Sequence, residues 1–207
     1  MAYRINNKLT FVHIPKNAGT SISRWIEKYT PYEYDDVRHQ HISLLPAEWQ
    51  NNIFVVVRNP WARAVSWYLF VQQMLNKKNI GPNKQFIQPQ LSVLAEGFEN
   101  FVTLYSNRVF TKSKFARGPH IMTLKSIAQV NYFDDEFNGT VLRYENLDSD
   151  WKKIQDLVGC HKPLPVTNKT VFYSTKNWQS FYNERTKSVV AKLFEKDIER
   201  FRYSFDS

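Results

Sequence analysis

Residues 15–21 are the first in the chain whose types and spacing could do chemistry. They follow a short apolar run at 11–14 and precede residues 22–29, whose apolar side chains recur at helical spacing. A strand, a tight loop and a helix in this order offer an anion backbone N–H groups at a positive helix terminus. Lys16 would add a mobile positive charge, and Gly19 would allow close approach of the backbone. We therefore predict a loop that holds a phosphate-like or sulfate-like group. Its residues are Pro15, Lys16, Asn17, Ala18, Gly19, Thr20 and Ser21.

This loop differs from the phosphate loop of Walker A type, which reads GxxxxGK[ST]. Here the lysine precedes the glycine, and the segment holds one glycine only. A second interpretation of the same residues is an ordinary turn from strand to helix. In that case Thr20 or Ser21 would be the N-cap residue of the helix.

A second segment, residues 54–66, also carries polar groups after a buried strand. Its first four residues are continuously apolar, as in strands buried on both faces. Asn59 before Pro60 predicts a helix start, with asparagine as the cap and proline at the first helical position. Arg58 could present its guanidinium to a phosphate, and Ser66 could donate a hydroxyl to the same group. Taken alone, the segment also fits an arginine that closes a strand and a serine buried in a helix.

Together the two segments resemble the sulfotransferase superfamily, whose members use 3′-phosphoadenosine 5′-phosphosulfate (PAPS) as sulfuryl donor. The resemblance implies that the first loop binds the 5′-phosphosulfate. It also implies that Arg58, with Ser66 eight residues later, binds the 3′-phosphate. The amino-acid sequences of the two motifs are most similar to those of carbohydrate sulfotransferases, including the heparan sulfate 2-O type. Residues 143–147 and 188–205 resemble later parts of the family pattern, so the resemblance covers most of the chain.

Sulfuryl transfer to a hydroxyl requires a base, and histidine suits this role because its pKa lies near neutrality. The pair His39 and His41 falls between the two donor-binding segments. The resemblance to the 2-O type implies that His41 is the base and that His39 lies near the acceptor. The pair also fits a solvated loop or half of an incidental metal site. His13 lies ahead of the first loop, and we expect it to serve packing or loop geometry.

Lys16 is expected to act in catalysis as well as in binding. The oxygen that bridges sulfur and phosphorus gains negative charge in the transition state, and a positioned ammonium stabilises that charge. Lys176, in a second loop at 163–177, is a weaker candidate for closing over the donor. This scheme needs no metal, and we see no set of metal ligands at suitable spacing in the sequence.

The alternation of strands and helices predicts an α/β fold in a single domain over residues 1–207. Strands are expected at 9–14, 53–57 and 139–142 in a central parallel sheet flanked by helices. The resemblance implies the P-loop NTPase-like sulfotransferase fold, in which ligands lie at the carboxyl ends of the strands. The expected helices span 20–29, 60–75, 98–106, 149–158 and 178–201.

The net charge of +9 favours anionic partners: the nucleotide donor, an acidic glycan, a nucleic acid or a membrane surface. A nucleic-acid-binding module is not recognisable, and we see no signal peptide or membrane span, so we expect a cytoplasmic enzyme. The expected acceptor is a hydroxyl, and the resemblance favours that of a saccharide, either acidic or neutral. Two alternatives remain open: a nucleotide-dependent phosphotransferase of related fold, and a non-catalytic protein that binds nucleotides or polyanions.

Overall fold

The computed structural model describes residues 1–35, 41–76, 96–107, 128–165 and 175–207. Contacts between Cα atoms divide the chain into two compact units. The first comprises Met1–Arg58 and Gln129–Lys169, and the second comprises Asn59–Ala128 and Thr170–Ser207. Each unit is described by itself, and the expected single domain stays a prediction.

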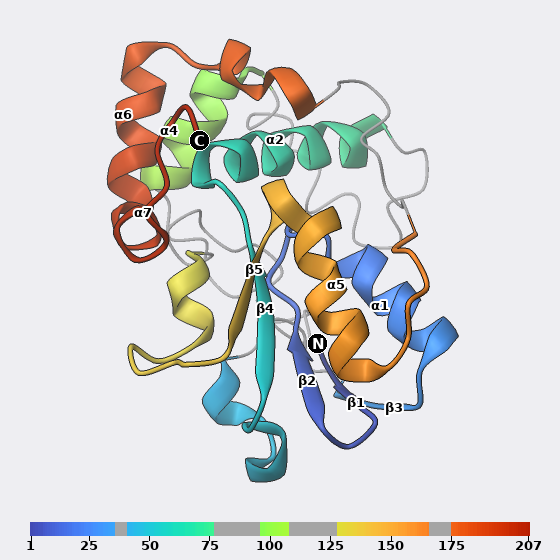
Figure 1. Ribbon diagram of the computed structural model, residues 1–207. Helices are drawn as coiled ribbons and strands as arrows, with labels where there is room; N and C mark the ends of the chain where they lie inside the picture. The colour runs from blue at the N-terminus through green and yellow to red at the C-terminus, as the bar shows by residue number, and fades with distance from the viewer. Residues whose placement is uncertain (36–40, 77–95, 108–127, 166–174) are drawn as a thin grey trace, which may run out of the picture. The chain divides into compact units, whose positions relative to one another are not determined.

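The first unit is built on a five-stranded sheet with the order β3-β1-β2-β4-β5 (Figure 1). The strands are β1 (Ala2–Ile5), β2 (Leu9–Val12), β3 (Tyr32–Asp35), β4 (Ile53–Val57) and β5 (Thr140–Arg143). β2, β4 and β5 run parallel, as their apolar sequences predict. The wholly parallel sheet expected from the sequence is wrong, because β1 pairs antiparallel with both β2 and β3.

A tight hairpin turn explains the antiparallel pair at the start of the chain. Asn6 and Asn7, the central residues of the turn over Ile5–Lys8, have φ of 50° and 55°, in the left-handed region that asparagine tolerates. The N–H of Lys8 donates to the Ile5 carbonyl at 2.9 Å and closes the turn. After the hairpin, β2 runs toward the loop at 13–18, which follows the carboxyl end of the strand.

The helices agree largely with the helical spacing in the sequence. They are α1 (Gly19–Tyr29), α2 (Pro60–Asn76), α4 (Phe98–Asn107), α5 (Leu147–Val158), α6 (Glu184–Leu193) and α7 (Glu195–Phe201). Short 3₁₀ segments are η1 (Ile42–Leu44), η2 (Ala47–Trp49), η4 (Gln129–Tyr132), η5 (Tyr144–Asn146) and η6 (Thr175–Phe181). The long helix expected at 178–201 is interrupted, because Phe194 has φ −115° and ψ 26° between α6 and α7.

The core of the first unit lies between the sheet and two helices that share one of its faces. Trp25 of α1 and Trp151 of α5 meet edge to face, with ring centroids 5.0 Å apart. Both belong to one cluster with Phe54 of β4 and Phe11 of β2. In the described part of this unit, α1 and α5 therefore cover the same face, whereas the sequence suggested helices on both sides.

The second unit is helical and rich in aromatic contacts. Phe98 of α4 packs edge to face on Tyr182, with centroids 4.8 Å apart, and on Tyr68 of α2 at 5.5 Å. The indole of Trp61 donates to the Lys187 carbonyl of α6 at 3.1 Å. These contacts fix the first turn of α2, which directly follows Arg58 in the chain.

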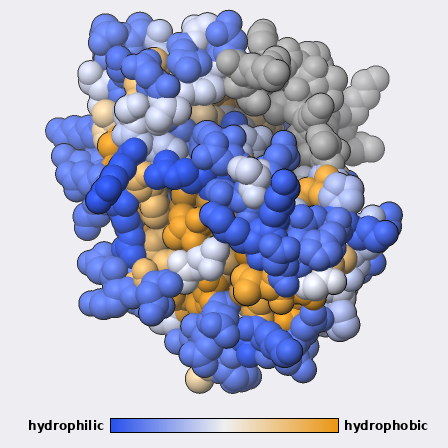
Figure 2. Space-filling view, in the orientation of Figure 1, coloured by the Kyte–Doolittle hydropathy of each residue, from blue (hydrophilic) through white to orange (hydrophobic). Residues whose placement is uncertain are grey.

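The surface in Figure 2 is mostly hydrophilic, in keeping with the basic composition. Hydrophobic residues gather on this face over the lower part of the sheet, where β4 and β5 lie in Figure 1. Leu157 of α5 is 63% exposed, and Val141 of β5 is also exposed. Among the described helices, none has both the length and the apolar character needed to cross a membrane.

Candidate active site

The loop between β2 and α1 meets the amino terminus of a helix that carries no side-chain cap. Ala18 is the N-cap residue of α1, and its side chain makes no capping hydrogen bond to the first turn. Thr20 and Ser21 lie inside the helix, so the interpretation in which one of them caps it is wrong. The first turn of α1 has no acidic residue either. An uncapped positive helix terminus of this kind suits an anionic ligand.

The backbone of the loop adopts an uncommon conformation at two positions. Lys16 has φ 70° and Ala18 has φ 61°, both in the left-handed region that residues with a side chain seldom occupy. Such conformations cost free energy and persist where the surrounding structure holds them. Turns of this type can also direct successive N–H groups into an anion-binding concavity. The conformation is compatible with anion binding, and the binding of the donor by this loop stays a prediction.

Asn17, between these two residues, anchors the loop to the sheet. Its side chain is 1% exposed, and Nδ2 donates to the Val56 carbonyl and to Oε1 of Gln129, at 2.7 Å each. Val56 belongs to β4, the strand next to β2. The sequence placed Asn17 among the residues that bind the donor. The described contacts give its amide an anchoring position, and a direct contact with the donor stays a prediction.

Gly19 is required by a neighbouring side chain. A Cβ at this position would overlap Cδ2 and Nε2 of His13. The His13 ring is stacked on Phe11, with centroids 6.0 Å apart and an interplanar angle of 18°. The expected packing role of His13 therefore agrees with the structure, and it accounts for a glycine that the sequence attributed to close approach of a ligand.

Arg58 follows β4 and reaches the same loop. Its Nη1 donates to the Lys16 carbonyl at 3.3 Å, and its guanidinium carbon lies 4.0 Å from the centroid of the Tyr144 ring. Arg58 is only 4% exposed. The structure thus brings two predicted donor-binding residues, Arg58 and Lys16, together at the carboxyl ends of β4 and β2. Binding of the 3′-phosphate by this guanidinium stays a prediction.

Ser66 lies on α2, in the second unit, and is 7% exposed. The helix begins as predicted, with Asn59 Oδ1 accepting from the N–H groups of Trp61 and Ala62 at 3.0 and 3.3 Å. Arg58 belongs to the first unit and Ser66 to the second, so the predicted 3′-phosphate pair is divided between the two units. The pairing of Arg58 with Ser66 therefore stays a prediction.

Two predicted site residues fall outside the side chains that the structure describes. His39 lies within 36–40, outside the described residues. The backbone of Lys176 belongs to η6, but its side chain is not among those described. Their roles stay predictions. Within the described residues, no group of three histidine, cysteine or acidic side chains is placed to hold a metal ion.

Comparison with known proteins agrees with this geometry. Residues 4–204 match the profile of the sulfotransferase family. The chain belongs to the sulfotransferase family. A search of curated proteins and a search of solved structures each gave no match. The family assignment therefore rests on a match over nearly the whole chain, and it leaves the carbohydrate-type subfamily a prediction.

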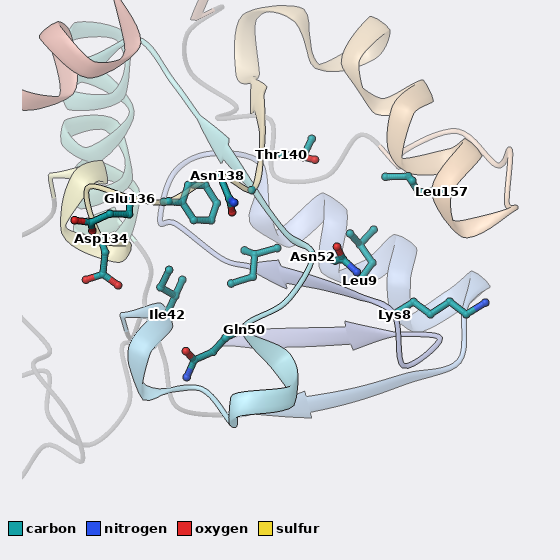
Figure 3. A pocket seen from close by; sticks show the side chains of 13 residues that line it. Lys8, Leu9, Ile42, Gln50, Asn52, Asp134, Glu136, Asn138, Thr140 and Leu157 are labelled. Carbon is teal, nitrogen blue, oxygen red and sulfur yellow. The ribbon is translucent and has the colours of Figure 1, made fainter.

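His41 lies away from the donor loop of this sulfotransferase. It precedes η1, where Nδ1 is 2.8 Å from Ser43 Oγ and Nε2 is 3.6 Å from Asp134 Oδ1. Asp134 and Ile42 line a cavity of about 720 Å³ at the amino ends of β2, β4 and β5 (Figure 3). Lys16 follows the carboxyl end of β2, at the opposite edge of the sheet. The structure therefore does not bring His41 and Lys16 together, and the base role of His41 stays a prediction.

The cavity in Figure 3 differs in character from the donor loop. Its walls combine apolar residues with carboxylates and amides, among them Leu9, Ile53, Phe137, Glu136, Gln50 and Asn138. In open sheets of this type, ligands bind beyond the carboxyl ends of the parallel strands. The cavity is at the other edge, so its size does not make it the donor site.

Two residues that contact the site were absent from the sequence-based candidates. Gln129 bonds to both Asn17 and Arg58, and Tyr144 packs on the Arg58 guanidinium. Tyr144 lies within the 143–147 segment, which the resemblance singled out without a role for the tyrosine. The sequence around Gln129 offers no periodicity or motif that would have marked it.

Proposed function

We propose that this sulfotransferase takes the sulfuryl group from PAPS and transfers it to a hydroxyl. The amino terminus of α1, which has no capping side chain at Ala18 and lies in the same loop as Lys16, is the observation that carries the proposal. An N-cap residue without a capping side chain, a lysine in the preceding loop and no acid in the first turn match the needs of a phosphosulfate. The residues that would hold it are Pro15, Lys16, Asn17, Ala18, Gly19, Thr20 and Ser21.

PAPS would supply an activated sulfuryl group attached to a phosphate leaving group. The acceptor oxygen forms a bond to sulfur while the bond from sulfur to the bridging oxygen breaks. Lys16 and the amino terminus of α1 stabilise the negative charge that the leaving phosphate gains, more strongly in the transition state than in the ground state. Arg58 and Ser66 are the residues that we propose for the 3′-phosphate.

The proton of the acceptor hydroxyl must pass to a base. His41 is the residue that the resemblance favours. If its Nε2 carries the ring proton toward Asp134, Nδ1 is left as the acceptor, and Ser43 Oγ lies 2.8 Å from that nitrogen. Although His41 lies at the amino ends of the strands and the predicted donor loop at their carboxyl ends, His41 is the base that we propose.

The acceptor class that we propose is a saccharide. The proposal rests on the resemblance of the two predicted donor-binding motifs to those of carbohydrate sulfotransferases. The net charge of +9 is compatible with an acidic glycan. A panel of sulfated and unsulfated saccharides, compared with small alcohols and a tyrosine peptide, tests it directly. Turnover confined to an alcohol or to the peptide would exclude the saccharide.

Calorimetric binding of adenosine 3′,5′-bisphosphate, the product of the donor, tests the function. The titration is done in EDTA, with ATP as competitor. We expect metal-independent binding that ATP does not displace at equal concentration. A preference for magnesium and ATP would instead indicate a phosphotransferase. Binding without sulfuryl transfer to any acceptor of the panel would indicate a non-catalytic binding protein.

A further inference from the structure

The side chain of Gln129 continues the hydrogen bonding of β4 beyond the end of the strand. Gln129 begins η4 and is 0% exposed. Its Oε1 accepts from the N–H of Arg58 at 2.8 Å, and its Nε2 donates to the Arg58 carbonyl at 2.9 Å. The amide side chain thus bonds to both the N–H and the carbonyl of Arg58, as the main chain of a neighbouring strand would.

The same Oε1 also accepts from Nδ2 of Asn17 at 2.7 Å. Asn17 in turn donates to the Val56 carbonyl, one residue before the last residue of β4. Two buried amides, from residues 112 positions apart in the chain, therefore tie the loop after β2 to the end of β4. All the atoms involved belong to the first unit.

Burial makes this pair a determinant of loop geometry. A buried amide nitrogen is costly to leave unbonded, so the two bonds of Asn17 Nδ2 fix how far this side chain lies from the end of β4. Lys16 and Ala18, on either side of Asn17, are the two loop residues with positive φ. A conformation of this kind relaxes unless neighbouring structure holds it.

We propose that Gln129 is a positioning residue of the donor site. Through Asn17 it holds Lys16 and Ala18 in their left-handed conformation, and through the main chain it holds Arg58 beside the loop. Gln129 itself touches neither the donor nor the reacting atoms in this scheme. The inference rests on the proposed function, because the anion concerned is that of the donor.

The first experiment compares Gln129→Ala with the unchanged protein for binding of adenosine 3′,5′-bisphosphate. We expect the dissociation constant to rise by about 10-fold or more, since a misplaced loop loses charge-assisted hydrogen bonds. Trp25→Phe is the matched control. It removes one partly buried hydrogen bond of the same unit, from Trp25 Nε1 to the Lys162 carbonyl at 2.7 Å, at a site outside the loop. We expect this control to lower the melting temperature and to leave the dissociation constant within twofold.

A double-mutant cycle separates positioning from general destabilisation. If Gln129 acts through Asn17, Asn17→Ala and Gln129→Ala impair binding through the same contact. The double variant should then bind no more than about twofold more weakly than the worse single variant. Multiplying effects, or binding by Gln129→Ala within twofold of the unchanged protein, would overturn the proposal.

Amide hydrogen exchange without nucleotide tests the positioning independently of the proposed function. We expect Gln129→Ala to accelerate exchange in residues 16–20, while Trp25→Phe leaves exchange there unchanged. Equal exchange in all three proteins contradicts the inference. Absence of nucleotide binding by the unchanged protein refutes the proposed function instead, and the exchange result then decides the positioning role alone.

Discussion

Replacement of Gly19 by alanine should destabilise the protein although alanine is the better helix former. At a helical position without neighbours, this change stabilises by up to about 1 kcal/mol. The added Cβ of residue 19 would overlap the His13 ring, which is itself stacked on Phe11. Forcing a methyl group into a packed site costs about 1–3 kcal/mol. The overlap should therefore outweigh the propensity, with a net loss of about 1 kcal/mol.

Removal of the ring should reverse the sign. In a His13→Ala background, the space beside residue 19 is open, and Gly19→Ala should stabilise by up to about 1 kcal/mol. The coupling between the two substitutions should equal the cost of the overlap, about 1–3 kcal/mol. Urea denaturation of the four proteins measures it from the midpoints and slopes.

Gly97→Ala provides the control for this cycle. Gly97 directly precedes α4, and a Cβ there would meet nothing within 4 Å. Its effect should be the same with and without His13. Coupling below about 0.5 kcal/mol between the substitutions at 13 and 19 would refute the packing argument, because that is the scatter of independent sites. Binding of the nucleotide by the double variant then shows whether Gly19 also serves the ligand.

Three further changes test other parts of the structure. Lys16→Ala should lower turnover by about 10²–10³-fold, as loss of a transition-state charge donor does, and an unchanged kcat on a working acceptor would remove Lys16 from catalysis. Tyr144→Leu should weaken nucleotide binding by up to about 10-fold because the Arg58 guanidinium loses its aromatic partner, whereas Tyr144→Phe keeps the ring and should leave binding unchanged. Equal effects of the two substitutions would contradict a role of the ring. Burial and the hydrogen bond to Glu27 raise the pKa of Tyr3 to about 12, so the neutral phenol stabilises the fold fully below pH 10 and this stabilisation is lost as pH rises toward 12. Denaturation between pH 9 and about 12 should show that loss in the unchanged protein and a smaller one in Tyr3→Phe, and parallel curves would exclude Tyr3 as its cause.

Local chemistry made several parts of the fold predictable. Asn59 and Pro60 begin α2 as a cap and a first helical residue, because both effects depend on neighbouring atoms only. The apolar run before Arg58 forms β4, and the strand, loop and helix around Lys16 are where the sequence put them. Local signals were sufficient here because the residues that determine each of these elements are neighbours in the sequence.

Other features depend on contacts that no short segment contains. The hydrogen bond between Asn17 and Gln129 joins residues 112 positions apart. The local sequence around each residue does not distinguish a buried amide from a solvent-exposed one. Strand β3 was missed because its residues are polar or exposed and it pairs only with β1 at the sheet edge. His41 follows a segment outside the described residues, and the neighbour that it faces, Asp134, is distant from it in the sequence.

The arrangement at the carboxyl ends of β2 and β4 gives a reason why the proposed donor site would need few side chains of its own. The two strands are hydrogen-bonded neighbours, so the loop after one and Arg58 after the other are set by the register of the sheet. The amides of Asn17 and Gln129 extend that register past the strand ends, and the Arg58 guanidinium bonds to the Lys16 carbonyl. Substitutions deep in the core should therefore mainly lower the free energy of unfolding. Substitutions in these amides should appear first in the affinity for the nucleotide, because they alter where the charges lie while most of the buried apolar area remains.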